Sequence, residues 1–573
     1  MSLLDVTGLT IRYGEDVVVD SVDIFVERGE SVGLVGESGS GKTQSAMAIL
    51  GLLSRRAQVS GSIEFDGQPL LGRAEAELDR FRARRIGIVF QDPMQALNPY
   101  LRAGRQLRQI LLRHGLASGA EADARVVEML ERVGLPDPER QFRAYPHEMS
   151  GGIRQRVMLA AALIAEPELL IADEPTTALD VTVQAQILQL LEDIRDETAL
   201  LLITHDLGVI AGHCEHMIVL EQGRVVDAGP TTSLFAAPGH EHTRRLIEAA
   251  PRVDRGEPPA PVSSTTVLSV GNAVVDYDDQ RAVNDVSFAV HAGETVAVVG
   301  ESGSGKSSLV RGLLGLLPLA AGRVIYAGER LAGPVQKRAQ AQRRDLQLVF
   351  QDPLSALDPQ MRVRTIVEEP LVIHEAGLTA AERRARVIAV LEKVGLGEKY
   401  LRRFPHELSG GQAQRVSIAR ALVLGPKVLV CDEAVAALDG TVRRQVLELL
   451  AREQRESGLS IVFISHDLAV VRTISHRVLV MYAGRLVESA ESRTLFASPR
   501  HPYTRALLDS IPVPDPVVAP RRAVLGGEVP SLMEPPAGCV FHPRCPRAAG
   551  ICSEKVPALR NVGGSRVACH FAE

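Results

Sequence analysis

The stretch Gly36-Glu-Ser-Gly-Ser-Gly-Lys-Thr43 decides the fold, and it recurs almost unchanged as Gly300-Glu-Ser-Gly-Ser-Gly-Lys-Ser307. Both copies fit the pattern G-x-x-x-x-G-K-[ST] of a phosphate-binding loop. Glycines let the backbone N–H groups of such a loop converge on phosphate oxygens at the beginning of a helix. Each copy follows a short apolar run and precedes a helical pattern, which is the context that the motif requires. A glycine-rich turn without a ligand is a poor explanation for two such copies.

These loops predict which residues contact the phosphates and the accompanying metal ion. The lysine of each loop neutralises the β- and γ-phosphates, and the hydroxyl that follows it ligates Mg²⁺. We therefore expect Mg²⁺ at Thr43 and at Ser307. The expected phosphate-binding residues are Gly36, Ser38, Gly39, Ser40, Gly41 and Lys42 in the first loop, and Gly300, Ser302, Gly303, Ser304, Gly305 and Lys306 in the second.

Four further blocks recur in the same order, which indicates that a whole domain has been duplicated. They begin at residues 89, 145, 171 and 203, and each second copy follows after about 260 residues. Residues 248–266 are rich in Pro, Ser, Thr and charge, a composition typical of a linker. We predict a first domain over 1–247, this linker, a second domain over 267–490, and a C-terminal extension over 491–573.

Short apolar runs in both halves are typical of buried parallel strands. Examples are SVGLVG at 31–36 and VLVCD at 428–432. Helical periodicity marks segments such as 121–135 and 380–396, each with a glycine near its end. Strands that alternate with helices predict an α/β fold. Here that fold would be two tandem domains, each with a mostly parallel sheet core and a helical part.

An acidic pair closes one apolar run in each half, about 130 residues after the phosphate loop. The pairs are Asp173-Glu174 and Asp432-Glu433. The carboxyl ends of parallel strands meet at one edge of a sheet, where open α/β proteins bind their ligands. The aspartates are candidate Mg²⁺ ligands, usually through water, and the glutamates are candidate general bases for an attacking water.

The order of these blocks resembles one superfamily, the ATP-binding cassette (ABC) ATPases, over about 490 of the 573 residues. The decisive block is Leu408-Ser-Gly-Gly-Gln412, which looks like the family's signature, with Met149-Ser-Gly-Gly-Ile153 as its counterpart. The resemblance implies two phosphate-loop ABC domains with ATP and Mg²⁺ as cofactors. The other matching positions are Gln91 and Gln351 of the Q-loop, which also contact Mg²⁺, Asp180 and Asp439 of the D-loop, the switch histidines His205 and His466, and the adenine-stacking candidates Tyr13 and Tyr277.

The same resemblance implies a head-to-tail pair of domains inside one chain. Each ATP would lie between the phosphate loop of one domain and the signature of the other, because neither half alone encloses the nucleotide. One site would join Lys42 to the second signature, and the other would join Lys306 to the first. The signature residues are Ser150, Gly151 and Gly152, and Ser409, Gly410, Gly411 and Gln412. Ile153 departs from the signature glutamine, and an apolar side chain cannot donate a hydrogen bond, so we expect the Lys42 site to turn over faster.

Several blocks resemble the oligopeptide/dipeptide importers of this superfamily. They are QDPMQALNPYLR, QDPLSALDPQMR and SPRHPYTRALLDSIP, together with the blocks around both signatures. The resemblance implies separate membrane permeases gripped by residues 92–149 and 352–408, a solute-binding protein, and a peripheral location at the cytoplasmic face of the membrane. Dipeptides, longer peptides, glutathione, nickel chelates and haem all remain open as the transported solute.

Four of the six cysteines gather in the last 35 residues with the spacing Cys-x5-Cys-x6-Cys-x16-Cys. They are Cys539, Cys545, Cys552 and Cys569, in a segment with few apolar periodic positions. Its order must come from a ligand or from packing on the second domain. Four thiolates suit zinc or an iron–sulfur cluster, and unliganded thiols or disulfides stay open. The resemblance to peptide-importer ATPases implies a [4Fe-4S] cluster. His542 and His570 are alternative ligands by residue type, but ordinary surface histidines explain them better.

Composition argues against two other classes of twin-domain protein. The net charge is −6 and Trp is absent, so a nucleic-acid partner is not expected. The runner-up, a soluble twin ATPase acting on ribosomes or DNA, would carry basic arms or long charged insertions. A nucleotide-gated scaffold without turnover is disfavoured by the two candidate bases. The first residues do not read as a secretory signal, and no run of 18 apolar residues predicts a membrane span.

Overall fold

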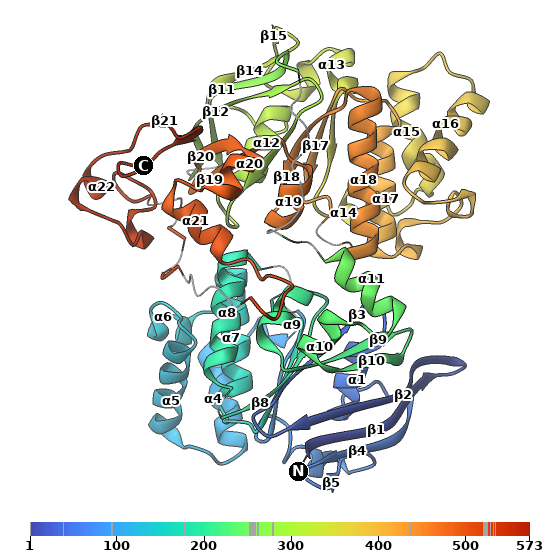
Figure 1. Ribbon diagram of the computed structural model, residues 1–573, viewed down its shortest axis with the longest axis vertical. Coiled ribbons are helices and arrows are strands. Elements are labelled where there is room, and N and C mark those ends of the chain that lie inside the picture. Colours follow the sequence, from blue (N-terminus) through green and yellow to red (C-terminus); the bar gives the residue numbers. More distant parts are fainter. Residues whose placement is uncertain are drawn as a thin grey trace. The chain divides into compact units, whose positions relative to one another are not determined.

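The computed structural model divides the chain into two compact units (Figure 1), which are described separately. The first unit is 1–250 with 512–524, and the second is 251–511 with 525–573. Two predicted site residues, Ser38 and Asp439, lie outside the described residues, as does most of the predicted linker. The structure describes residues 2–37, 39–92, 96–176, 179–195, 197–250, 252, 259, 263–277, 280–435, 438, 440–518, 525–527, 529–530, 532 and 535–573.

A six-stranded sheet forms the core of the first unit, in the order β10-β9-β3-β8-β7-β6. Its five strands β9, β3, β8, β7 and β6 run parallel, and β10 pairs antiparallel at the edge. The runs predicted as buried parallel strands are confirmed, since every residue of β3 and β7 is buried. The bounds are β3 Ser31–Gly36, β6 Ile86–Val89, β7 Leu169–Asp173, β8 Ala199–Ile203, β9 His216–Glu221 and β10 Arg224–Pro230.

Both faces of this sheet are covered, which explains why its central strands are almost wholly apolar. Leu200 and Leu202 point into a core shared with the helical part, whereas Leu201 and Ile203 point into a core shared with a second sheet. Successive side chains of a strand alternate between faces, so a strand buried on both sides has few polar positions. The helices of the unit are α1 Lys42–Ile49, α2 Glu75–Leu78, α4 Ala103–Arg113, α5 Gly119–Arg132, α6 Pro138–Arg143, α7 Gly151–Leu163, α8 Val181–Asp193, α9 Leu207–His213, α10 Thr231–Ala236 and α11 Glu241–Ala249.

The second sheet of the first unit is antiparallel, in the order β2-β1-β4-β5. It packs with α1 on one face of the parallel sheet. On the other face, α4, α5 and α6 contact one another and α7, and together they form the helical part (Figure 1). The predicted helix at 121–135 is observed as α5, which ends at Arg132. The strands are β1 Ser2–Tyr13, β2 Asp16–Glu27, β4 Ala57–Phe65 and β5 Gln68–Pro69.

The second unit repeats this arrangement and extends it. Its antiparallel sheet has the order β12-β11-β14-β15, and its main sheet has the order β16-β17-β18-β13-β19-β20-β22-β21. The two last strands come from the C-terminal extension, where Glu488 of β20 pairs with Val567 of β22. The strands are β11 Thr266–Tyr277, β12 Gln280–His291, β13 Thr295–Val299, β14 Ala321–Tyr326, β15 Glu329–Arg330, β16 Leu346–Val349, β17 Val428–Asp432, β18 Ser460–Ile464, β19 Arg477–Tyr482, β20 Arg485–Glu491, β21 Arg560–Val562 and β22 Ser565–Val567.

Most helices of the second unit follow the order of the first, but a 3-10 turn at Glu398–Tyr400 stands in place of α6, α22 lies in the tail, and the predicted helix at 380–396 is observed as α16. Because β22 pairs with β20 and Phe541 lies in a core of the second unit, the tail owes part of its order to packing on that unit, which is one of the two sources expected from the sequence. The bounds are α12 Lys306–Leu314, α13 Gln340–Asp345, α14 Pro353–Ala356, α15 Val363–His374, α16 Ala380–Lys393, α17 Gly410–Leu422, α18 Gly440–Ser457, α19 Leu468–Ile474, α20 Ser492–Ala497, α21 Pro502–Asp509 and α22 Gly550–Glu554.

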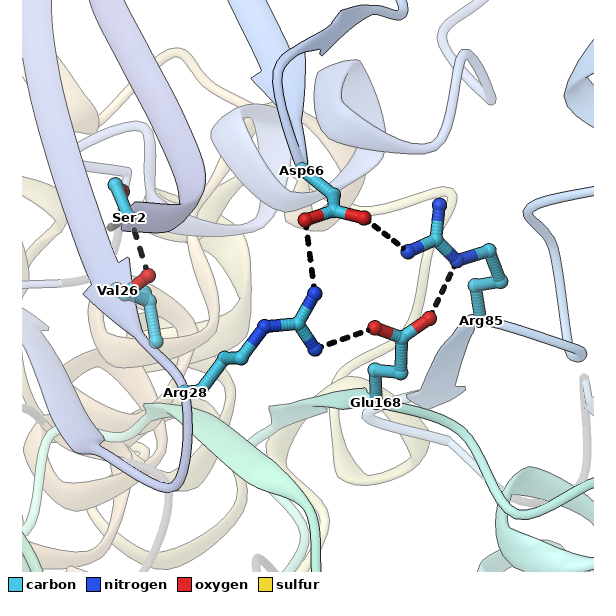
Figure 2. A network of polar contacts seen from close by, with 6 residues as sticks. All are labelled: Ser2, Val26, Arg28, Asp66, Arg85 and Glu168. Atoms are coloured by element: carbon cyan, nitrogen blue, oxygen red, sulfur yellow. Dashed lines mark hydrogen bonds and ion pairs between the residues drawn. The ribbon is translucent and has the colours of Figure 1, made fainter.

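A closed ring of four charged side chains joins the two sheets of the first unit (Figure 2). Arg28 binds Asp66 at 2.8 Å and Glu168 at 2.6 Å, and Arg85 binds the remaining oxygens of the same two carboxylates. The guanidinium of Arg85 also lies 4.8 Å from the ring centroid of Phe65. Hydrogen bonds from the arginines lower the pKa of both Asp66 and Glu168. The ring ties the turns at the amino ends of β6 and β7 to the antiparallel sheet.

The second unit holds the same junction without this ring. The positions that match Arg28 and Asp66 are Ala292 and Ala327, and Asp345 replaces Arg85. There the hydroxyl of Tyr326 donates to Asp345 at 2.8 Å. The two copies of the domain therefore fasten the same pair of sheets by different chemistry.

We predict that Glu168→Gln destabilises the first unit by about 1 kcal/mol, the upper range for a partly exposed charge network. Because the folded pKa of Glu168 and Asp66 is depressed, their contribution is fully present above the unfolded pKa of about 4, and it is lost at lower pH, as the pH falls through the folded pKa. Hydrogen exchange over 57–69 and 86–89 at pH 7 and at about pH 2.5 measures this loss. The matched control Glu139→Gln removes an exposed single pair with Arg143 and should change nothing. Equal exchange for both variants would contradict the prediction.

Candidate functional site

The phosphate loops join the central strand of each sheet to a helix. In the first unit β3 ends at Gly36 and α1 begins at Lys42, and in the second β13 ends at Val299 and α12 begins at Lys306. The residue before each lysine, Gly41 or Gly305, has a positive φ of 98° or 95°. A Cβ at Gly305 would lie 2.3 Å from the carbonyl oxygen of Ala282, so both conformation and space demand glycine there. These turns place the helix N-termini at the carboxyl edge of each parallel sheet.

Each loop lysine is buried and folded against its own loop. The Nζ of Lys42 donates to the carbonyl oxygens of Gly36 at 2.8 Å and Glu37 at 2.9 Å. Lys306 repeats both contacts at 2.8 Å with Gly300 and Glu301. Burial lowers the pKa of Lys42, and the opposing effect of the nearby acidic side chains is smaller. Each lysine thus lies at the beginning of its helix, against the carbonyl oxygens of the loop; that it neutralises the β- and γ-phosphates stays a prediction.

The predicted Mg²⁺ ligands meet at the end of the neighbouring strands. Within the described residues, both carboxylate oxygens of Asp173 are buried and have no hydrogen-bond partner. In the second unit the Ser307 hydroxyl donates to Asp432 at 3.1 Å. Burial raises the pKa of Asp173 and Asp432. A buried carboxylate beside a loop hydroxyl is the donor set of a hard cation, so Thr43 with Asp173 and Ser307 with Asp432 fit Mg²⁺.

The candidate bases stand in a strained backbone conformation. Glu174 and Glu433 have φ values of 47° and 49°, which a residue with a side chain rarely adopts. Each still donates its backbone N–H to the next strand, to Ile203 at 2.8 Å and to Ile464 at 3.1 Å. The backbone hydrogen bond keeps each glutamate in line with its strand, while the positive φ changes the direction of its side chain. Such outliers gather at functional sites because the surrounding structure has to maintain them.

The Q-loop glutamine and the switch histidine of each unit converge on this glutamate. The Gln91 amide donates to Glu174 at 3.0 Å, and the His205 ring nitrogen lies 3.3 Å from the other carboxylate oxygen. The second unit gives 2.7 Å for Gln351 and 3.5 Å for His466, both to Glu433. The hydrogen bond from His466 is the main cause that lowers the pKa of Glu433. Glu433 is therefore ionised, and in both units the glutamine and the histidine orient the glutamate carboxylate, as a general base requires.

The signature serines begin the helices α7 and α17. Ser150 accepts a hydrogen bond from the N–H of Ile153 at 3.4 Å, and Ser409 accepts one from Gln412 at 3.3 Å. Gln412 also accepts from the Ser409 N–H at 3.2 Å, so it closes a capping box on its own helix. Ile153 is buried in the core of the helical part instead. With Ile153 in this place, the first signature lacks the side-chain hydrogen bond that Gln412 makes to the backbone N–H of its signature serine.

The remaining predicted residues occupy the edges of the sites. The Tyr13 hydroxyl donates to Gln44 of α1 at 2.7 Å, so Tyr13 lies beside the helix that follows the phosphate loop. Tyr277 ends β11 and is exposed. Asp180 directly precedes α8. Whether either tyrosine stacks on adenine stays a prediction.

One buried contact of this region was not predicted from the sequence. The Gln155 side chain, on the signature helix α7, donates to the carbonyl oxygen of Pro175 at 2.6 Å, two residues after Asp173. It connects the signature helix to the acidic pair. The only signal available in the sequence was the glutamine that both copies carry two residues after the signature, at positions 155 and 414.

Comparisons with known proteins identify the arrangement. The family model described as ABC transporter matches residues 19–177 and 283–436, once in each unit. The chain belongs to the ABC transporter family. It is an ATP-binding subunit with two ATPase cassettes in one chain, the first and second units. The model for the oligopeptide/dipeptide transporter C-terminal region matches residues 487–552.

Curated relatives share the whole two-cassette layout. The glutathione import ATP-binding protein GsiA of Salmonella choleraesuis (strain SC-B67) is 41% identical, covering 92% of this chain and 93% of its own. GsiA of Escherichia coli (strain K12) is 40% identical over the same shares. Among solved structures, CbiO1 from Clostridium perfringens is 30% identical, covering 41% of this chain and 92% of its own, with a TM-score of 0.37.

We predict that Glu174→Gln and Glu433→Gln each slow ATP hydrolysis about 100-fold or more while Mg-ATP still binds. Glutamine keeps the size and hydrogen bonding of the side chain but cannot take the proton of the attacking water. Phosphate-release assays and nucleotide binding measure the two effects, with Glu128→Gln on the exposed face of α5 as the control. Near-normal turnover in the double variant would remove both residues from the catalytic role.

The same two single variants compare the two sites. If the Lys42 site turns over faster, Glu174→Gln removes more of the total activity than Glu433→Gln. Because Gln412 caps its own helix, such a difference would act through the orientation of Ser409. Equal losses would contradict unequal turnover.

Proposed function

We propose that the chain hydrolyses ATP at two composite sites to energise the import of short peptides through separate membrane subunits. The observation that carries this proposal is the complete set of catalytic groups in both cassettes, combined with the oligopeptide/dipeptide transporter C-terminal region. In this proposal Lys42, Asp173 and Glu174 work with the signature at Ser409, and Lys306, Asp432 and Glu433 work with the signature at Ser150.

The proposed chemistry follows from the contacts in each cassette. Mg²⁺, when bound, would be held by Thr43 and Asp173, or by Ser307 and Asp432, and would supply charge for the phosphates. The lysine and the loop N–H groups bind and orient the β- and γ-phosphates. The glutamate takes the proton of the attacking water, while the glutamine and histidine hold its two oxygens in place. A signature serine from the opposite cassette would complete the γ-phosphate shell.

A groove on the second cassette supports docking of a membrane subunit. It holds about 260 Å³ between the sheet edge and the helical part, and Pro370 of α15 forms one wall. Apolar and charged groups share it: Leu316, Phe350, Arg338, Arg343, Glu369 and Arg420. Val372 and Ile373 of the same helix are more than half exposed. Exposed apolar side chains mixed with charged groups suit a short amphipathic helix of a permease.

The first cassette exposes apolar side chains at matching positions, Leu52 and Leu112. We therefore propose one permease subunit for each cassette. Among the described residues, no helix combines the length and the apolar character needed to cross a membrane. A solute-binding protein would deliver the peptide, and a location at the cytoplasmic face of the membrane follows from this assembly.

Peptides are favoured as the solute by two independent resemblances. The C-terminal region matches oligopeptide/dipeptide transporters, and the curated relatives named above import glutathione, which is itself a small peptide. We propose solutes of this size class.

We predict that peptide-loaded binding protein stimulates ATP hydrolysis of the chain in vesicles that contain its two permeases. Leu316→Asp in the groove together with Val372→Asp on the exposed face of α15 should abolish this stimulation and the recovery of the chain with the membrane fraction. Charge on this surface prevents apolar docking, while nucleotide binding persists. Val556→Asp in the exposed tail is the control. Stimulation by a nickel chelate or haem but not by peptides would replace the proposed solute, and unchanged recovery of the double variant would exclude the groove.

We further propose that Cys539, Cys545, Cys552 and Cys569 hold a [4Fe-4S] cluster. No disulfide joins the described cysteines, and the Cys539 N–H donates to the carbonyl oxygen of Cys552 at 2.7 Å. Burial raises the pKa of Cys539 and Cys545, and the other thiols of the set add to the effect. Within the described residues, however, no three His, Cys, Asp or Glu side chains are arranged to hold a metal ion. The proposal therefore rests on the donor chemistry and the sequence pattern.

We predict about four iron atoms per chain and broad visible absorption in protein purified without oxygen. Cys545→Ser should remove most of this iron, because a cubane cluster needs four ligands, while Cys214→Ser, a buried cysteine of the first cassette, should not. Iron analysis and absorption spectra measure both. Stoichiometric zinc without iron would replace the cluster, and four freely reactive thiols in the native protein would exclude any metal.

A further inference from the structure

A buried ion pair connects the cysteine-bearing tail to the second phosphate loop. The two terminal nitrogens of Arg544 donate to the two carboxylate oxygens of Glu301, at 2.7 Å and 3.1 Å. The side chains are only 4% and 1% exposed. Glu301 follows Gly300 inside the phosphate loop, and Arg544 immediately precedes Cys545. Such a bidentate pair out of water is stable only while both partners stay in place.

Glu301 is held by its backbone as well as by its side chain. Its carbonyl oxygen accepts from the Lys306 ammonium at 2.8 Å, and its N–H donates to the Tyr503 hydroxyl at 2.9 Å. Any displacement of the Glu301 side chain therefore moves a carbonyl that positions the phosphate-binding lysine. Arg544 acts on that lysine through one intervening residue.

An aromatic cluster holds the part of the tail around Arg544 against the second cassette. Phe541, which is 1% exposed, packs edge-on against Tyr482 at 5.2 Å between ring centroids and against Tyr503 at 5.5 Å. The Tyr482 hydroxyl accepts from Arg544 at 3.2 Å. The Arg544 Nε also donates to the carbonyl oxygen of Gly526 at 3.1 Å, so tail, strand β19 and helix α21 meet around one guanidinium.

The first cassette lacks these partners at the matching positions. Glu221 stands in place of Tyr482, and His242 stands in place of Tyr503. These two side chains pair with each other at 3.1 Å. Glu37, which matches Glu301, is exposed, whereas Glu301 is 2% exposed. The same loop residue thus lies at the surface in one cassette and beneath the tail in the other.

From these contacts we propose that Arg544 is a positioning residue of the second nucleotide site, through which the cysteine-bearing tail holds the second phosphate loop in its ATP-binding shape. This inference rests on the proposed ATP sites. Without Arg544, the Glu301 carboxylate would be buried without a countercharge, and the loop would have to open to hydrate it. Anything that unseats the tail would then weaken ATP binding at the second site and spare the first.

Nucleotide titrations of the full chain can read the two sites separately. Lys42→Ala leaves the second site as the binding site, and Lys306→Ala leaves the first. With a fluorescent ATP analogue and Mg²⁺, we expect Arg544→Gln to raise the Kd about tenfold in the Lys42→Ala chain and to leave it unchanged in the Lys306→Ala chain. Arg544→Lys, which keeps the charge but loses the bidentate geometry, should fall between. Arg547→Gln, at an exposed arginine of the same segment, is the control and should change neither Kd.

A second variant and a second readout guard against misfolding of the tail. Tyr503→Phe removes only the hydroxyl that accepts from Glu301, and it should also weaken the second site alone. Hydrogen exchange without nucleotide should rise over 299–307 in both variants and stay constant over 35–43. An unchanged Kd at the second site, or equal losses at both sites, would overturn the proposal. Failure of the parent chain to bind two nucleotides would instead contradict the ATP sites themselves.

Discussion

The structure depends on one turn, the passage from the buried central strand to the helix that follows each phosphate loop. Within five residues in the first cassette and six in the second, the chain has to leave a fully buried strand, expose several N–H groups at one point and begin a helix. Glycines at positive φ and a lysine folded back on the loop carbonyls make this possible. Because β3 and β13 have parallel neighbours on both sides, the acidic pairs and the switch histidines end at the same edge as the loop. The catalytic groups are neighbours because the strands are parallel.

The two cassettes keep this edge nearly identical while their surroundings have diverged. Around the glutamate, the contacts to the glutamine and the histidine repeat within a few tenths of an ångström. Away from it, the four-charge ring of the first cassette is replaced by a single tyrosine–aspartate hydrogen bond in the second. Catalysis constrains the geometry around the glutamate, whereas many different side-chain contacts can hold the two sheets together.

The C-terminal tail gives the second cassette contacts that the first cassette does not have. It extends the main sheet by β22 and β21 and buries an arginine against the phosphate loop. The aromatic residues beneath it, Tyr482 and Tyr503, are Glu221 and His242 in the first cassette. In the second cassette these rings pack against Phe541 of the tail, whereas in the first cassette Glu221 and His242 pair with each other. The proposed role of the tail at the second nucleotide site depends on this difference between the cassettes.

The sequence by itself determined the motifs, their order and the duplication, and from these the α/β fold and the candidate catalytic residues could be predicted. Those features are local: a phosphate loop, an acidic pair or an apolar strand is written in consecutive residues. Only the tertiary structure decided which distant residues meet, such as Arg544 with Glu301 or Gln155 with Pro175. It also showed that Ile153 packs in a core while Gln412 caps a helix. No local pattern marks such pairs, because a buried ion pair depends on two segments about 240 residues apart that are joined only by packing.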